Sequence, residues 1–198
     1  RGGGRLSRRL RFEDDRLHEF LERNGAELAL VPGSNGKRLC LGFFAAEPAY
    51  WSGRPGSTPE GELREAIATL REAGFEVVLD VVFNHTAETD EDGPTLSFRG
   101  LGNRQYYRVD PARPARYLNW SGCGNSLNLA EPQVLRFVMD ALRHWVLAFG
   151  VDGFRFDLAS SLGRDARGEF STGAAFFGAL RADPVLREVL WVAEPWDL

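Results

Sequence analysis

Apolar residues recur at helical spacing in two long stretches of the chain. After Thr58, a residue type that caps helix N-termini, Leu63, Ile67 and Leu70 fall on one face. Residues 132–149 repeat the pattern more strongly, and a glycine follows the last apolar residue of each stretch. Both stretches predict amphipathic helices that bury one face.

Three shorter apolar runs are typical of β-strands: Phe75–Phe83, Gly153–Leu158 and Leu190–Glu194. The first run is interrupted only by Asp80, which is typical of a parallel strand covered on both faces. In the second run, apolar side chains that include Leu158 alternate with an Arg and an Asp. Side chains alternate across a strand, so the two sets are expected on opposite faces.

Weaker signals complete the prediction: helices at residues 14–23 and 173–181, a strand at 28–31 and a turn at 32–36. Strands that alternate with helices indicate a parallel sheet, either doubly wound or closed into a (β/α)8 barrel. No glycine-rich phosphate loop follows any strand, which counts against a nucleotide-binding sheet.

A long stretch without a period, residues 86–130, separates the first clear strand from the second strong helix. Glycine and proline interrupt it repeatedly, and irregular segments of this length inside a domain are usually functional. It carries four aromatic residues of interest: Tyr106, Tyr107, Tyr117 and Trp120.

Composition narrows the class of protein. The chain has 198 residues, 43% of them hydrophobic, which is enough for one domain with a core. Its net charge of −4 gives no reason to expect nucleic acid or an anionic membrane as a partner. No apolar run approaches a membrane span, no signal peptide is present, and Cys40 and Cys123 are too few for a disulfide framework. A cytoplasmic location is the default expectation.

Polar residues gather at the C-terminal end of each clear strand. These ends lie together in a parallel sheet, and in barrels they form the catalytic edge. Residues distant in sequence are therefore expected to converge. They are Asp80, Asn84, His85, Arg155, Asp157 and Glu194.

Two carboxylates from neighbouring strands suggest glycoside hydrolysis, with one as nucleophile and the other as acid and then base. Arg155 beside Asp157 favours the ionised carboxylate of a nucleophile. An apolar setting is expected to raise the pKa of Glu194, as a general acid needs. His85 can donate hydrogen bonds to sugar hydroxyls, and the aromatic residues of 86–130 either offer flat faces to sugar rings or pack. A structural ion pair is the alternative for the Arg and Asp.

Three strand-end motifs resemble the α-amylase family, glycoside hydrolase family 13. They are DVVFNH at residues 80–85, GFRFD at 153–157 and VAEPW at 192–196. Four further segments resemble its glycogen debranching enzyme and isoamylase branch. These are HTAE at 85–88, GPTLSFRG at 93–100, GCGNSLN at 122–128 and EPWD at 194–197.

The resemblance implies a partial (β/α)8 barrel, about strands 2 to 5, with a long excursion after the third strand. It implies retaining hydrolysis of α-1,6 branch linkages in an α-glucan such as glycogen or a limit dextrin. It makes Asp157 the nucleophile and Glu194 the general acid/base. It places His85 and Arg155 at the sugar subsite next to the cleaved bond. It gives Asp80 a hydrogen-bonding, mostly structural role.

Asn84 is expected with this substrate-binding set. No metal and no cofactor are expected. The alternatives are an α-1,4-acting amylase or glucanotransferase of the same family, or an inactive remnant.

Two departures from the family stand out. A His-Asp pair that the family uses on a later strand is absent from the 198 residues, so an incomplete catalytic domain that does not act alone is expected. A Tyr-Trp-Gly-Tyr-Asn-type segment of relatives is replaced by GAELALVPGSNGKRLC at residues 25–40. We expect residues 41–198 to form the partial barrel. Residues 1–40 are irregular, and either a shifted reading frame or a genuine insertion would explain them.

Overall fold

The computed structural model describes residues 43–195. The elements predicted at 14–23, 28–31 and 32–36, and the hypothesis of a shifted reading frame, concern residues outside this range. In chain order, the elements are the 3-10 turn η1 (Pro48–Tyr50), α2 (Pro59–Glu72), β1 (Val78–Val81), α3 (Phe98–Tyr106), β2 (Val109–Asp110), β3 (Arg113–Tyr117), α4 (Pro132–His144), the π-helical turn η2 (Trp145–Phe149), β4 (Gly153–Phe156), α5 (Ala159–Leu162), α6 (Ala175–Ala182), the 3-10 turn η3 (Leu186–Glu188) and β5 (Leu190–Ala193).

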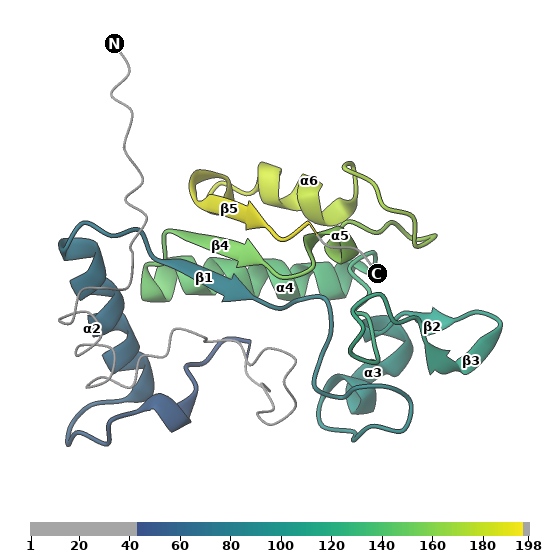
Figure 1. The fold of residues 1–198 in the computed structure, drawn as a ribbon, viewed down its shortest axis with the longest axis horizontal. Coiled ribbons are helices and arrows are strands. Elements are labelled where there is room, and N and C mark those ends of the chain that lie inside the picture. The colour runs from purple at the N-terminus through teal and green to yellow at the C-terminus, as the bar shows by residue number, and fades with distance from the viewer. Residues whose placement is uncertain (1–42, 196–198) are drawn as a thin grey trace, which may run out of the picture.

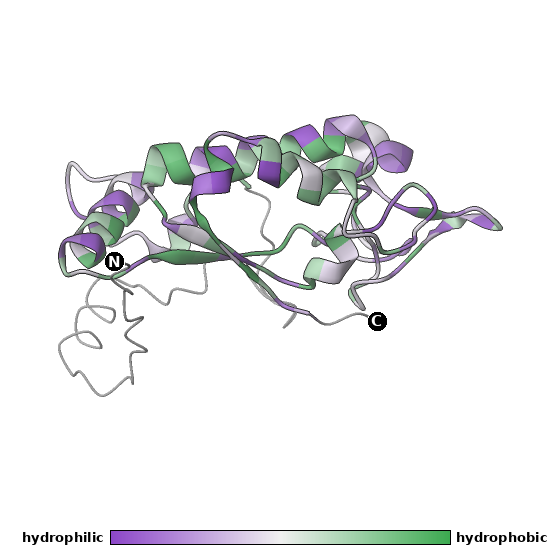
Figure 2. Cartoon of the chain, turned by 90° about the horizontal axis from the view of Figure 1, so that it is seen from above, coloured by the Kyte–Doolittle hydropathy of each residue, from purple (hydrophilic) through white to green (hydrophobic). Residues whose placement is uncertain are grey.

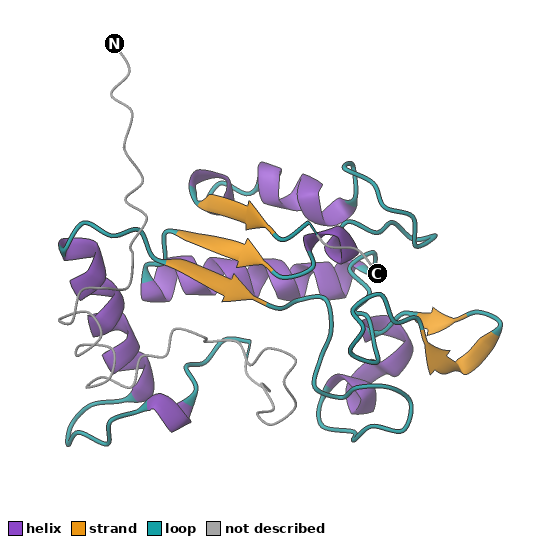
Figure 3. Cartoon of the chain, viewed as in Figure 1, coloured by secondary structure: helices purple, strands orange, loops and turns teal. Residues whose placement is uncertain are grey.

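Strands β1, β4 and β5 form a parallel sheet in that order (Figures 1 and 3). Helix α4 lies between β1 and β4 in the chain, and α6 lies between β4 and β5. The predicted alternation of strands with helices, and the parallel sheet, are therefore confirmed. None of the helices within residues 43–195 is long and apolar enough to cross a membrane.

The two faces of the sheet differ in chemistry. Leu79 of β1 and both Phe154 and Phe156 of β4 are at most 6% exposed and belong to the main hydrophobic cluster. Asp80 and Arg155 stand opposite each other in the register and project from the other face. The alternation read from the sequence therefore gives one apolar face and a second face on which Asp80 and Arg155 stand among apolar residues such as Val192.

Helix α4 covers the apolar face. Val134, Val138 and Leu142 are at most 1% exposed, and the apolar stripe continues through η2, as the sequence predicts. Gly150 ends the helix with φ +75°, a conformation that glycine adopts without strain. Figure 1 shows α4 behind β1 and β4, and Figure 2 shows the helices gathered on one side of the sheet.

The paired strands are shorter than the apolar runs that predict them. Pairing of β1 ends at Val81. Burial continues beyond the hydrogen-bonded ladder, since Phe83 is only 2% exposed. The prediction for Leu158 is wrong: it does not continue the strand, and its φ of 44° and ψ of 53° are left-handed. Its backbone N–H donates to the Glu194 carboxylate, which helps to hold this turn.

Residues 86–130 contain a helix and a hairpin that the sequence analysis does not predict (Figure 3). Helix α3 includes Gly100 and Gly102, and Gly102 interrupts it with non-helical angles. Two glycines weaken helix propensity and dilute the apolar period, which explains the missed element. Strands β2 and β3 pair antiparallel, and most of β3 is exposed.

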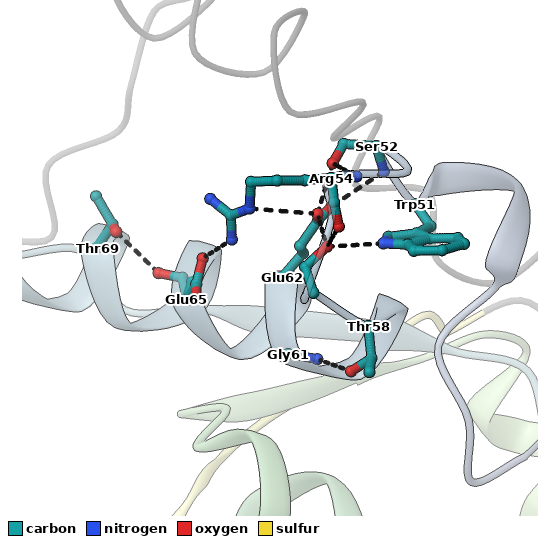
Figure 4. A network of polar contacts seen from close by, with 9 residues as sticks. Trp51, Ser52, Arg54, Thr58, Gly61, Glu62, Glu65 and Thr69 are labelled. Carbon is teal, nitrogen blue, oxygen red and sulfur yellow. Dashed lines mark hydrogen bonds and ion pairs between the residues drawn. The ribbon is translucent and has the colours of Figure 1, made fainter.

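Helix α2 begins as predicted. The Thr58 side chain accepts a hydrogen bond from the Gly61 backbone N–H at 3.0 Å (Figure 4). The preceding loop is tied to the helix by Glu62, whose carboxylate accepts hydrogen bonds from Ser52 and Ser57. These bonds lower the pKa of Glu62 to about 2.

Replacing Thr58 by Ala should loosen the first turn of α2. Loss of an N-cap costs about 1 kcal/mol. That change raises the population of the open first turn, and so its amide exchange rate, by roughly five-fold. Hydrogen-exchange mass spectrometry of the α2 peptides measures it. Thr69→Ala is the matched control, because Thr69 lies on the same helix and bonds only the Glu65 carbonyl. Equal exchange in the two variants would contradict the capping role.

Candidate active site

The polar residues predicted at the strand ends lie together. The ends of β1, β4 and β5 meet at one edge of the sheet, and side chains from all three are joined by hydrogen bonds. The residues brought together are Asp80, Asn84, His85, Arg155, Asp157 and Glu194. The convergence expected from a parallel sheet is therefore present.

Arg155 links the three strands. Its Nη1 donates to both carboxylate oxygens of Asp80, at 2.8 and 2.6 Å. Its Nη2 donates to Glu194 Oε1 at 2.6 Å. One guanidinium thus holds a carboxylate from each neighbouring strand, and the two negative charges raise the pKa of the Arg155 side chain further.

Asn84 fixes Asp157. The Asn84 side chain is 2% exposed, and its Nδ2 donates to both the carbonyl oxygen and Oδ2 of Asp157, each at 2.8 Å. Asp157 in turn shares a hydrogen bond with Glu194. The two carboxyl groups are therefore adjacent, although they lie 37 residues apart in the sequence (194 − 157 = 37).

The predicted directions of the two carboxyl pKa values are wrong for this ligand-free arrangement. Burial raises the pKa of Asp157, and the neighbouring carboxyl of Glu194 adds to the rise. The Leu158 backbone N–H lowers the pKa of Glu194, and Arg155 lowers it further. The reason is that Arg155 pairs with Glu194 and Asp80, so its hydrogen bonds favour the ionised form of Glu194.

His85 is held beside this pair. Asn84 Nδ2 is committed to Asp157, so the Asn84 oxygen faces His85 Nδ1, which must carry a proton to bond it. Burial lowers the pKa of His85, which favours the neutral ring. The neutral ring then offers Nε2 as a hydrogen-bond acceptor. The expectation that His85 donates to a ligand therefore becomes one of accepting from a hydroxyl.

The aromatic residues of 86–130 differ in burial. Tyr107 is 1% exposed and packs in the main hydrophobic cluster. Tyr106, Tyr117 and Trp120 are half-buried. Tyr106 stacks on Phe98 with the ring centres 4.4 Å apart, and Arg108 and Arg164 each lie over the Trp120 ring, at 5.5 and 4.6 Å from its centre. The structure gives Tyr107 the packing role, and contact of the other three with sugar rings stays a prediction.

Comparisons with known proteins identify relatives of this arrangement. No protein-family model matches the chain. The chain is 45% identical to the glycogen debranching enzyme of Erwinia tasmaniensis over 180 residues, which take in 81% of this chain and 27% of that protein. It is 48% identical to the glycogen debranching enzyme of Salmonella paratyphi A over 158 residues, which take in 80% of this chain and 23% of that protein.

The chain is therefore a relative of the glycogen debranching enzymes. It spans about a quarter of the length of the curated relatives it matches. Solved structures agree. A pullulanase from Bacillus acidopullulyticus is 33% identical, with a TM-score of 0.59; the match takes in 77% of this chain and 17% of the pullulanase chain. The type I pullulanase of Bacillus subtilis is 30% identical, with a TM-score of 0.62; the match takes in 79% of this chain and 20% of the pullulanase chain.

A buried acid, Glu88, holds the backbone of the segment that resembles the debranching enzymes. Glu88 is 1% exposed, and its carboxylate accepts hydrogen bonds from the backbone N–H groups of Leu96, Ser97 and Arg99 at 2.7 to 3.0 Å. The Tyr107 hydroxyl donates a further bond. Glu88 thereby caps α3 from outside, since the Ser97 side chain makes no capping bond.

In the sequence, Glu88 and Asn125 stand out only as parts of family signatures, and no role is predicted for either of them. Asn125 is 0% exposed and Glu88 is 1% exposed. The feature of the sequence that could have pointed to them is their chemistry, since both are polar residues within a glycine-rich stretch. Such residues can satisfy the backbone of an irregular segment.

Among residues 43–195, no group of three or more His, Cys, Asp or Glu side chains is placed to hold a metal ion. The catalytic and substrate-binding roles read from the sequence remain predictions at this point.

Replacing Glu88 by Gln should destabilise the protein by about 1–3 kcal/mol at pH 7, because buried donors lose a charged acceptor. Burial acts to raise the pKa of Glu88, but the bonds from Tyr107 and the backbone outweigh it and lower that pKa. The stabilisation is therefore present above the unfolded pKa of about 4.5 and is lost as pH falls through the lower folded value.

Urea denaturation at pH 7 and at pH 4 and below measures this difference between wild type and Glu88→Gln. The gap should narrow in acid. Glu91→Gln is the control, because Glu91 makes a partly exposed pair with Arg116. A gap that stays constant across this pH range would refute the role of the ionised carboxylate.

Proposed function

We propose that this chain carries the nucleophile and the acid/base of a retaining glycoside hydrolase that cleaves α-1,6 branch linkages of glycogen or limit dextrins. The observation that carries the proposal is the hydrogen-bonded pair Asp157 and Glu194 at the edge of the parallel sheet. An inverting pair stands about 6.5–9.5 Å apart to admit a water, whereas a retaining pair is closer, at about 5–5.5 Å. Direct contact favours the closer class.

In the proposed reaction, the Asp157 carboxylate attacks the anomeric carbon while the glycosidic C–O bond breaks. Glu194 gives its proton to the departing oxygen. In the second step, Glu194 removes a proton from water, whose oxygen attacks the same carbon and releases Asp157. Arg155 and Asp80 fix Glu194, and Asn84 fixes Asp157.

The first step needs the proton on Glu194, whereas the surroundings of the pair raise the pKa of Asp157 and lower that of Glu194. Two carboxyl groups in contact titrate as a pair, and their shared hydrogen bond offers the proton a direct path. A sugar ring placed between them would break that bond. Asp157 would then depend on the Asn84 donor, which favours its ionised form.

We also propose that β1, β4 and β5 are strands 3 to 5 of a (β/α)8 barrel. The strands are neighbours in chain order, and the helices lie on one side of the sheet (Figure 2). A doubly wound sheet reverses its strand order and carries helices on both faces. The likeness to pullulanases supports the barrel.

The substrate class rests on the relatives. They are named glycogen debranching enzymes, and one related pullulanase structure holds maltose. We therefore propose an α-glucan as the partner, with no nucleic acid and no membrane, and a cytoplasmic location. The same carboxylates could serve an α-1,4-acting enzyme or a transferase. Product analysis on a branched dextrin separates these reactions.

Glu194→Gln in the full gene product should lower kcat on a branched dextrin by about 10²–10⁴-fold. The loss should be much smaller on an α-glucosyl fluoride, whose leaving group needs no proton. Asp157→Asn should abolish turnover of both substrates. Asp140→Asn, on the surface of α4, is the matched control and should leave kcat unchanged.

Covalent trapping tests the assignment of roles. A fluorinated substrate that forms the glycosyl-enzyme quickly and hydrolyses slowly should label the peptide that contains Asp157. A label on Glu194 would reverse the roles. Normal turnover by Asp157→Asn would reject the mechanism, and no turnover by the wild type would favour the inactive alternative.

A further inference from the structure

Residues 84–86 and 125–127 run side by side next to the proposed catalytic pair. The Leu127 backbone N–H donates to the Asn84 carbonyl at 2.9 Å. The Asn125 side chain completes the pairing: its Oδ1 accepts from the Thr86 N–H at 3.0 Å, and its Nδ2 donates to the Thr86 carbonyl at 3.1 Å. The Asn125 amide thus bonds both the N–H and the carbonyl of Thr86, the residue after His85, as the backbone of a neighbouring strand would.

Asn125 is fully committed to this contact. It is 0% exposed, and its Nδ2 also donates to the Thr89 carbonyl at 2.7 Å. Thr86 Oγ1 bonds the Tyr107 hydroxyl at 2.6 Å and accepts a longer bond from Asn125 Nδ2, at 3.4 Å. Removing the Asn125 amide would leave the Thr86 backbone N–H without its acceptor, and the Thr86 carbonyl would keep only the long bond from the Thr89 N–H.

The same asparagine ends a tight turn at residues 121–125. Ser121 Oγ donates to the Asn125 carbonyl at 2.6 Å and accepts from the Cys123 N–H at 3.1 Å. Gly124 has φ +102°, and a Cβ there would lie 2.5 Å from the Asp90 backbone nitrogen. The turn therefore packs backbone against backbone, and no larger residue fits at Gly124.

Cys123 lies within this turn. Its backbone N–H donates to Ser121 Oγ, which also donates to the Asn125 carbonyl, so the turn that ends at Asn125 holds the backbone of Cys123. Burial raises the pKa of the Cys123 thiol, and the negative charge of Asp157 raises it further. The rate at which the thiol reacts therefore reports on how firmly the turn is held.

We infer that Asn125 is a positioning residue that fixes His85 beside Asp157 and also fixes the turn that carries Cys123. It acts on His85 through the backbone of Thr86, and on Cys123 through its own turn. The inference rests on the proposed function in one respect, which is that Asp157 is the nucleophile. A displacement of about 1 Å in a positioned group can cost 10²-fold in rate, so such a clamp matters for catalysis.

Asn125→Ala in the full gene product should free both segments. Carbethoxylation of His85 and alkylation of Cys123, each followed by peptide mass spectrometry without substrate, should become at least about five-fold faster, because the four side-chain hydrogen bonds of Asn125 are lost. His144, at the end of α4, is the internal reference and should react at its wild-type rate. Neither rate depends on turnover, so failure of the proposed function leaves this test intact.

Two variants serve as matched controls. Asn103→Ala removes an amide that accepts from the Tyr117 hydroxyl at 2.6 Å, and Tyr107→Phe removes a hydroxyl from the same buried network but leaves the bonds of Asn125 in place. Both should keep wild-type rates at His85 and Cys123.

Unchanged rates in Asn125→Ala, or a parallel rise at His144 that indicates general loosening, would overturn the inference. If Asn125→Ala does not fold, Gly124→Ala displaces the turn instead. It should speed Cys123 alkylation with His144 unchanged, and an unchanged Cys123 rate there would equally reject the clamp.

Discussion

The site depends on one guanidinium placed across three parallel strands. Carboxyl groups from β1, β4 and β5 meet at one sheet edge, where like charges repel each other. Arg155 donates to Asp80 on one side and Glu194 on the other, which offsets this repulsion and fixes two of the three acids. Its position follows from the register that pairs Asp80 with Arg155, so the ladder and the site are specified together.

The sheet alone does not complete the site. Asn84 and His85 leave β1 at the start of a long irregular segment, whose backbone groups need partners when they are buried. Asn125 and Glu88 provide them as buried side-chain acceptors, and Asn125 also as a donor. The strands thus supply the charged groups, and the excursion supplies the polar scaffold that holds His85 beside them.

Periodicity predicts what local sequence determines. Helices α2 and α4 begin and end where Thr58, Pro132 and the following glycines indicate, and the polar residues converge because parallel strands share an edge. Helix α3 is not predictable in this way, because two glycines lie inside it and its capping acceptor, Glu88, lies nine residues before the Ser97 position (97 − 88 = 9). The debranching-enzyme signatures mark that stretch without revealing its structure.

The reversed pKa directions show where sequence reasoning ends. In a continuing strand, Arg155 and Asp157 would share a face, and the cation would lower the pKa of its neighbour. The strand instead stops at Phe156, and Leu158 turns left-handed. That turn directs Asp157 to Asn84 and presents the Leu158 N–H to Glu194, which also receives Arg155. A single backbone conformation therefore decides which hydrogen-bond partners each carboxyl receives, and no periodic pattern records it.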